Sequence, residues 1–265
     1  MRVDWFMSVV GHWPDGLILF TGAATTAATA AAVALLARRT LFLPAQDRIS
    51  EHAKLADIVH SSLLAFAVFV LALVLTDVRS NMGKADDTVL REASTLSRLD
   101  RELELIGGPA ATAERTRLRD YVSEIVTLEW PSLGKAEPTL SREVTETMTD
   151  LIGGIRAIVS ANPGTGGTLA ALLDKLDDLR QTRLESATRT VPAIFWWLIG
   201  VFLLGAMVLN GRHAIDPASL SLITLHMAAI GLVIAFIVVM DEPFRGESSI
   251  HPTPILHALG PLPAR

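Results

Sequence analysis

The sequence of 265 residues contains no cysteine. This absence excludes disulfide scaffolds, cysteine-ligated zinc sites, iron–sulfur clusters and thiol nucleophiles. Charged residues are also scarce, at 19% of the chain against about 25% in an average globular domain. The motifs of phosphate-binding loops, zinc peptidases and serine hydrolases, including H-E-x-x-H and G-x-S-x-G, are absent as well. We therefore do not expect an enzyme, and we expect neither a cofactor nor a bound metal.

Apolar residues are abundant in the sequence. Half of the chain is hydrophobic, and the mean hydropathy is +0.41. An intrinsically disordered chain is poor in such residues and is thereby excluded. The formal net charge of −5 also argues against a nucleic-acid binder. The composition as a whole predicts a membrane protein whose first partner is the lipid bilayer.

The charged residues are concentrated in the middle of the chain. Residues 77–189 contain 34 charged residues among 113, whereas the remaining 152 residues contain only 17. Four uncharged segments of about 19–21 mostly apolar residues lie outside this region, and each is long enough to cross a bilayer. These segments are residues 17–37, 58–76, 191–209 and 220–240. The sequence therefore predicts four transmembrane helices.

The charged middle, residues 77–190, has a helical pattern throughout. Apolar residues recur there at steps of three and four in four successive stripes, which glycine- and proline-rich breakers separate. No proline and a single glycine, Gly83, stand between the second span and the first stripe, so we expect one continuous helix from about residue 58 to residue 106. The predicted fold is all-α, with a four-helix extramembrane domain (77–190) inserted between the second and third spans. An N-terminal part (1–76) and a C-terminal part (191–265) carry two spans and a tail each.

Several polar or aromatic residues of the spans are candidates for function. Five residues of the second span share one helical face and are candidates for lining a pore: Ser62, Phe66, Phe69, Leu73 and Thr76. The alternative is that they only pack against other spans. Ionisable groups inside a membrane are candidate functional sites by default, and here they are His60 and His226.

Charged residues follow the second and fourth spans directly. They are Asp77, Arg79, Asp241 and Glu242. If the spans alternate in direction, both ends emerge on the same membrane face. In an oligomer the three carboxylates would form an acidic ring at a pore mouth, and Arg79 would oppose their charge. The alternative interpretation is that they are ordinary stop signals at the membrane interface.

Short motifs in the chain point to a known family. The most specific are Glu129-Trp130-Pro131 and the D-x-P-F-x-G pattern at residues 241–246. The others are Arg38-Arg39, His52, residues 76–81, Glu92-Ala93, residues 99–101, Tyr121, Arg180, Arg183, Val191-Pro192 and Trp197. Together they resemble the bestrophin-like family of bacterial four-span membrane proteins, which has no assigned function.

The resemblance carries an expectation about function and location. True bestrophins are pentameric anion channels with a hydrophobic neck in the second span, and the resemblance implies a multi-pass protein of the bacterial inner membrane. We expect a homo-oligomeric ion channel of four to six subunits, with inorganic ions as its cargo and with the second span lining the pore. The alternative is a non-conducting sensor or scaffold whose helical domain binds a partner.

The sequence leads to two conflicting predictions for the orientation in the membrane. Basic residues are more frequent in the two short loops than in the tails, and by the positive-inside rule this places the helical domain outside the cytoplasm. The loop residues are Arg38, Arg39, Arg48, Lys54 and Arg212. The resemblance to true bestrophins instead implies a cytosolic domain.

Overall fold

The computed structural model describes residues 13–43, 53–135, 137–162, 164, 166–213 and 216–260, and the regular structure of these residues is entirely helical. The chain divides into two compact units. Unit 1 comprises Met1–Ser80 and Thr190–Asp241, and unit 2 comprises Asn81–Arg189 and Glu242–Arg265. Most of the predicted N-terminal tail, residues 1–12, lies outside the described residues.

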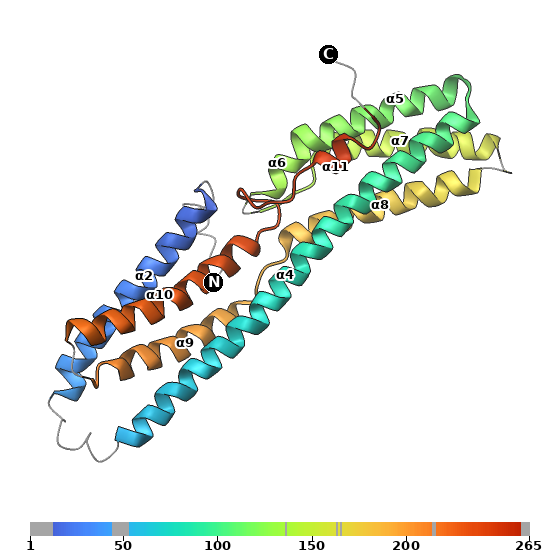
Figure 1. Cartoon of the computed structure of the whole chain (residues 1–265). Helices are drawn as coiled ribbons and strands as arrows, with labels where there is room; N and C mark the ends of the chain where they lie inside the picture. The colour runs from blue at the N-terminus through green and yellow to red at the C-terminus, as the bar shows by residue number, and fades with distance from the viewer. Residues whose placement is uncertain are drawn as a thin grey trace. The chain divides into compact units, whose positions relative to one another are not determined.

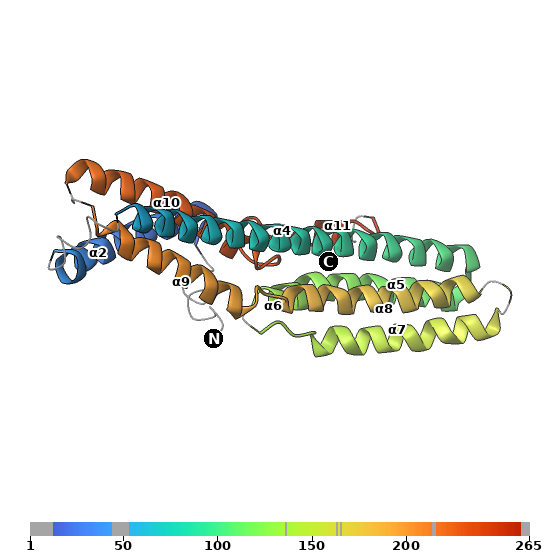
Figure 2. The same cartoon turned by 90° about the horizontal axis from the view of Figure 1, so that it is seen from below.

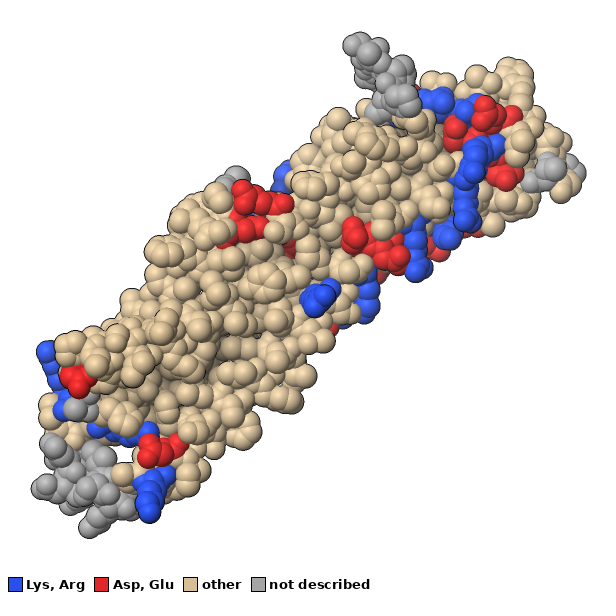
Figure 3. All heavy atoms as spheres, viewed as in Figure 1, with Lys and Arg blue, Asp and Glu red and all other residues tan. Residues whose placement is uncertain are grey.

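Unit 1 contains the predicted spans. Its helices are α2 (Asp15–Ala37) with the π-helical turn η1 (Arg38–Phe42), the first part of α4 (Ala53–Ile106), α9 (Ala193–Asn210) and α10 (Pro217–Met240). All four have the length and the apolar composition needed to cross a membrane. On the face shown in Figure 3, charged side chains lie at the ends of this unit, and the surface between them carries almost none. The prediction of four membrane-crossing helices is confirmed.

Small residues allow α2 and α10 to pack closely. A Cβ atom added to Gly22 would lie 2.5 Å from the Ala235 Cβ, and one added to Gly231 would lie 2.6 Å from the carbonyl oxygen of Gly22. Neither separation is possible between real atoms, so the two backbones approach as closely as they do because both positions are glycine. This is the packing that the alanine-, glycine- and threonine-rich composition of the first span predicts.

Unit 2 is a bundle of four long helices with shorter pieces between and beside them. Its elements are the remainder of α4, α5 (Gly108–Glu124), η3 (Ile125–Glu129), α6 (Trp130–Leu133), α7 (Arg142–Ala161), α8 (Gly166–Thr188) and α11 (Thr253–Leu256). Figures 1 and 2 both show α4, α5, α7 and α8 running side by side. The tight turn from α4 into α5 uses Gly107 and Gly108 at φ of +68° and +83°, values that favour glycine.

The predicted apolar stripes form the core of unit 2. Their residues are buried against one another from all four long helices, including Leu96, Leu118, Leu151 and Leu176. The stripes are therefore covered within a single subunit.

The segment after α10 also belongs to this core. Phe244 packs edge-on against Trp130 with ring centroids 5.4 Å apart, and Ile250 and Ile255 are buried nearby. These residues belong to the predicted C-terminal part (191–265), which also carries the last two spans. They join unit 2 because they bury apolar side chains there.

Four charged side chains are buried at the centre of unit 2. The Arg183 Nε donates to the Glu92 Oε2 at 2.8 Å, and its Nη2 donates to the Glu129 Oε1 at 2.9 Å. The Arg180 Nε donates to the Glu129 Oε2 at 3.1 Å, and its Nη2 donates to the Thr145 hydroxyl at 3.1 Å. All four charged side chains are at most 2% exposed. We call Glu92, Glu129, Arg180 and Arg183 the buried ionic cluster.

The buried ionic cluster contains two carboxyl groups and two guanidinium groups, so its formal charges balance. Burial alone would lower the pKa of the Arg183 guanidinium, but the neighbouring Glu92 and Glu129 carboxylates raise it above its ordinary value. Burial also raises the pKa of the adjacent Tyr121 hydroxyl, which therefore stays neutral. The Arg183 guanidinium carbon lies 5.3 Å from the centre of the Trp130 ring, within range of a cation–π interaction. The cluster thus joins α4, η3, α6, α7 and α8.

Breaking the buried ionic cluster is expected to destabilise unit 2. The Arg183→Met substitution leaves two buried carboxylates with a single remaining guanidinium, and removing one partner of a buried pair costs about 3–5 kcal/mol. Arg142→Met is the matched control, because Arg142 pairs with Glu146 on the surface and is 87% exposed. We expect the control to change the free energy of unfolding by less than about 1 kcal/mol. Chemical unfolding of both variants is the measurement, and equal losses would contradict this role.

The helix contact at Gly22 gives a second test. The added methyl group in Gly22→Ala clashes with Ala235, and overpacking of this kind costs about 1–3 kcal/mol. Gly200→Ala is the control within another span, because an added Cβ meets nothing within 4 Å there. It should be neutral or stabilising, since alanine favours helix over glycine by about 1 kcal/mol. Thermal unfolding in detergent compares the two variants, and a Gly22→Ala protein as stable as Gly200→Ala would refute the close contact.

Candidate functional site

The proposed pore-lining face of α4 is uncovered within the subunit. Phe66, Phe69 and Leu73 are 56%, 62% and 50% exposed, and Thr76 is exposed as well, whereas Ser62 is half-buried. Among the described residues, the one aromatic ring contact of this face joins Phe66 to Phe202 of α9, with ring centroids 5.7 Å apart. An apolar face of this kind on a membrane helix is available to lipid, to another subunit or to a pore.

The opposite face of α4 packs inside unit 1. Ala67, Leu71, Val74 and Val78 are buried against residues of α9 and α10. Their spacing of four, three and four residues matches that of the uncovered face, so the helix presents two distinct sides. Internal packing of the spans is therefore provided by a different set of residues from the proposed pore-lining set.

The charged residues at the exit of the spans differ in their surroundings. The Asp241 carboxylate accepts hydrogen bonds from the backbone N–H of Val191 at 3.0 and 3.2 Å and so ties the end of α10 to the entry of α9. The Glu242 carboxylate pairs with Arg245 at 3.2 Å. Asp77 and Arg79 are exposed on α4. Of the three proposed mouth carboxylates, Asp77 is the one whose side chain is exposed.

The ends of the four spans lie together at the two ends of unit 1, as expected if successive spans run in alternating directions. At one end, Met240 and Arg79 line the same cavity, which brings the end of α10 beside the exit of α4. At the other end, the Arg212 guanidinium pairs with Asp57, and Arg38 donates to the backbone carbonyl of His213. The exits of the second and fourth spans therefore lie together.

The two intramembrane histidines lie at the Arg212 end. The His60 side chain lies close to Asn210 and within electrostatic range of Arg212, His213 and His226. The His60 Nε2 atom is buried and has no hydrogen-bond partner among the described residues. Within the part of the chain that the structure describes, no three His, Cys, Asp or Glu side chains are grouped as metal ligands. His60 therefore lies among cationic and polar side chains at this end of unit 1, with His226 in its surroundings.

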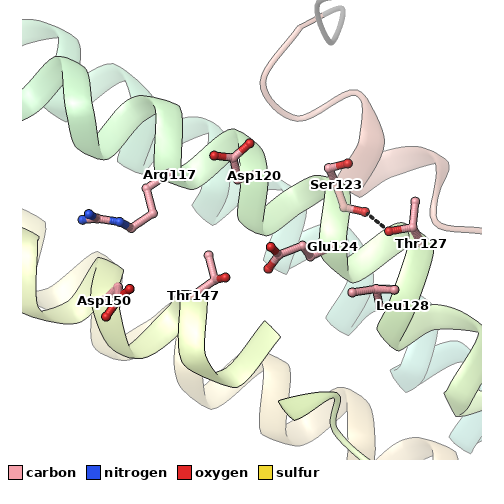
Figure 4. Close-up of a pocket in the computed structure, with 8 residues that line it drawn as sticks. All are labelled: Arg117, Asp120, Ser123, Glu124, Thr127, Leu128, Thr147 and Asp150. Carbon is pink, nitrogen blue, oxygen red and sulfur yellow. Dashed lines mark hydrogen bonds between the residues drawn. The ribbon is translucent and has the colours of Figure 1, made fainter. Parts of the chain in front are cut away.

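Unit 2 contains an open polar cavity of about 530 Å³ between α5 and α7. Figure 4 shows its lining, in which Asp120, Glu124 and Asp150 bring carboxylates to one region and Arg117 lies at one side. The Arg117 guanidinium donates to the Glu114 carboxylate at 2.5 Å. Sequence reasoning did not find this cavity, because its residues lie on two helices and form no local motif.

The buried ionic cluster is the other feature that sequence reasoning missed. Its residues were noted as motif positions, but no role was assigned to them. A signal was present in the stripe that runs along α8, where Arg183 occupies the position expected for an apolar side chain. A charged residue on the buried face of a helix requires a buried counter-charge, and Glu92 and Glu129 provide it.

Comparisons with known proteins agree with this architecture. The sequence matches the Bestrophin-like domain over residues 24–255. None of the curated proteins matches it. A crystal structure of a membrane protein is similar at a TM-score of 0.59 and 16% sequence identity, and the alignment covers 90% of this chain and 99% of that chain. At this identity the likeness concerns the fold alone.

The family match and the fold point in the same direction. Four helices are apolar and long enough to span a bilayer, and the similar structure is that of a membrane protein. The chain is therefore a multi-pass membrane protein. Because the matched range of residues 24–255 extends over most of its length, the chain belongs to the Bestrophin-like domain family.

Proposed function

We propose that this chain is one subunit of a homo-oligomeric ion channel of the bacterial inner membrane, in which α4 lines the pore. The observation that carries the proposal is the uncovered face of α4, which presents Phe66, Phe69 and Leu73 while the opposite face packs inside the subunit. Rings of such side chains around an axis would form a hydrophobic constriction, and constrictions of this type gate by dewetting.

The charge at the pore mouth bears on the selectivity of the channel. Asp77 is exposed and follows the last residue of the proposed pore-lining face. Repeated around a ring, this carboxylate would attract cations. The channel would therefore prefer cations, in contrast to the anion selectivity of true bestrophins. We further propose that the chain carries no catalytic activity.

The first test concerns Asp77. We expect Asp77→Asn to lower the permeability of cations relative to anions, because it removes the fixed charge at the mouth. The effect should be larger at 0.1 M salt than at 1 M, since the Debye length falls from about 10 Å to about 3 Å. Reversal potentials of the purified protein in planar bilayers under a salt gradient are the measurement. Asp178→Asn, an exposed position on α8, is the control and should leave them unchanged.

Two outcomes of the recordings would count against the proposal. An unchanged reversal potential in Asp77→Asn would remove this residue from the pore mouth. A correctly folded wild-type protein that gives no current would contradict a channel altogether. That second result would favour the alternative, a sensor or scaffold whose helical domain binds a partner.

The second test concerns the constriction. Phe69→Ala widens the proposed apolar ring, so the single-channel conductance should rise while the sign of selectivity stays the same. Val68→Ala is the matched control, because Val68 is also exposed at 52% but lies about 100° around the helix from Phe69. A larger conductance in both variants, or in neither, would contradict the assignment of this face to the pore.

The third test concerns the number of subunits. The uncovered apolar face of α4 is expected to pack in a symmetric ring of four to six copies. Native mass spectrometry of the full chain in mild detergent should therefore show one oligomer within this range. A protein that is only monomeric under these conditions would exclude the proposed pore.

A further inference from the structure

A cavity of about 550 Å³ opens between α4 and α10 at the exit of these spans. It lies entirely within unit 1. Its lining residues are Leu75, Thr76, Arg79, Ser80, Phe236 and Met240. They supply an apolar wall and a polar end.

The polarity of the lining changes along both helices in the same direction. On α4, Leu75 is followed one turn later by Arg79 and Ser80, about 6 Å further from the hydrocarbon core. On α10, Phe236 lies one turn before Met240, which is the last residue of the helix. The apolar part of the cavity therefore lies on the hydrocarbon side, and its cationic part lies at the level of lipid headgroups.

The guanidinium of Arg79 is available for a ligand. Arg79 is exposed, and it forms no hydrogen bond or ion pair with any residue that the structure describes. By contrast, Arg212 at the opposite end of the spans pairs with Asp57, and Arg245 pairs with Glu242. Arg79 is thus a membrane-level cation next to an apolar groove.

The nearest carboxylates in sequence do not occupy the cavity. Asp77 precedes Arg79 by two residues and therefore projects about 200° away around α4. Asp241 follows Met240, but its carboxylate is held by the backbone N–H of Val191. Neither residue is part of the cavity lining.

We propose that this cavity binds an anionic phospholipid of the surrounding leaflet. The lipid phosphate would accept hydrogen bonds from the Arg79 guanidinium and the Ser80 hydroxyl. One acyl chain would lie against Leu75, Phe236 and Met240. Arginine suits this role because its planar guanidinium donates two parallel hydrogen bonds to a phosphate. A net negative headgroup is favoured because no acidic side chain lines the cavity.

Native mass spectrometry of the full chain tests the proposal. The protein is exchanged in mild detergent into phosphatidylglycerol or into phosphatidylcholine, and the lipids retained per subunit are counted. We expect phosphatidylglycerol to be retained in preference to phosphatidylcholine. Arg79→Gln should lower the retention of phosphatidylglycerol about fivefold, the factor expected for one basic residue at an anionic membrane surface.

Two further variants separate a built site from general charge attraction. Lys84→Gln makes the same charge change on the same helix, at an exposed residue outside the cavity, and should retain most of the lipid. Met240→Trp fills the apolar part without altering charge and should also lower retention. Circular dichroism confirms that each variant keeps its helix content.

Several results would overturn the proposal. They are equal retention of the two lipids by the wild-type protein, equal losses in Arg79→Gln and Lys84→Gln, and unchanged retention in both cavity variants. Displacement of phosphatidylglycerol by millimolar inorganic phosphate would show a phosphate site instead of a lipid site. Release of lipid only when subunits dissociate, with no dependence on Arg79, would show that a second copy of the chain covers this groove.

Discussion

The balance of charge around Arg183 is the interaction on which unit 2 depends. Its guanidinium contacts carboxylates from α4 and η3 and lies against the Trp130 ring of α6. A buried charge is costly unless its partners are present, so helix registers that leave one of these charges unpaired are disfavoured. The cluster therefore determines how α4 is rotated within unit 2, because Glu92 must face inward. The same helix supplies the candidate pore-lining residues of unit 1.

Much of the architecture could be predicted because hydrocarbon and water impose simple demands on sequence. A span needs an uncharged apolar segment of sufficient length, and four such segments identify α2, α4, α9 and α10. The absence of proline between the second span and the first stripe predicts one helix, and α4 indeed runs without interruption from Ala53 to Ile106. The breakers at Gly107 and Gly108 then mark a turn, where positive φ values are found.

What could not be predicted depends on residues that are distant in sequence. A periodic pattern shows that Leu176 is buried, but it does not show that Arg180 and Arg183 meet Glu129, about fifty positions earlier. The membership of Phe244 in unit 2 was missed for the same reason, since a short apolar motif after a span does not indicate which residues it packs against. The cavities form where two helices diverge, and the points of divergence cannot be predicted from composition or from residue spacing.

The two proposed sites lie on neighbouring sides of α4 and share Thr76. With about 100° between successive residues, Phe69 and Leu73 lie on the uncovered face, and Arg79 lies on its α10 flank. Asp77 lies on the other flank, about 200° from Arg79. If Arg79 and Asp77 both faced the pore axis, the positive charge of Arg79 would oppose the attraction of cations by Asp77. A lipid phosphate bound to Arg79 would neutralise the guanidinium on the α10 flank of α4. The electrostatic potential at the pore mouth would then be set by Asp77.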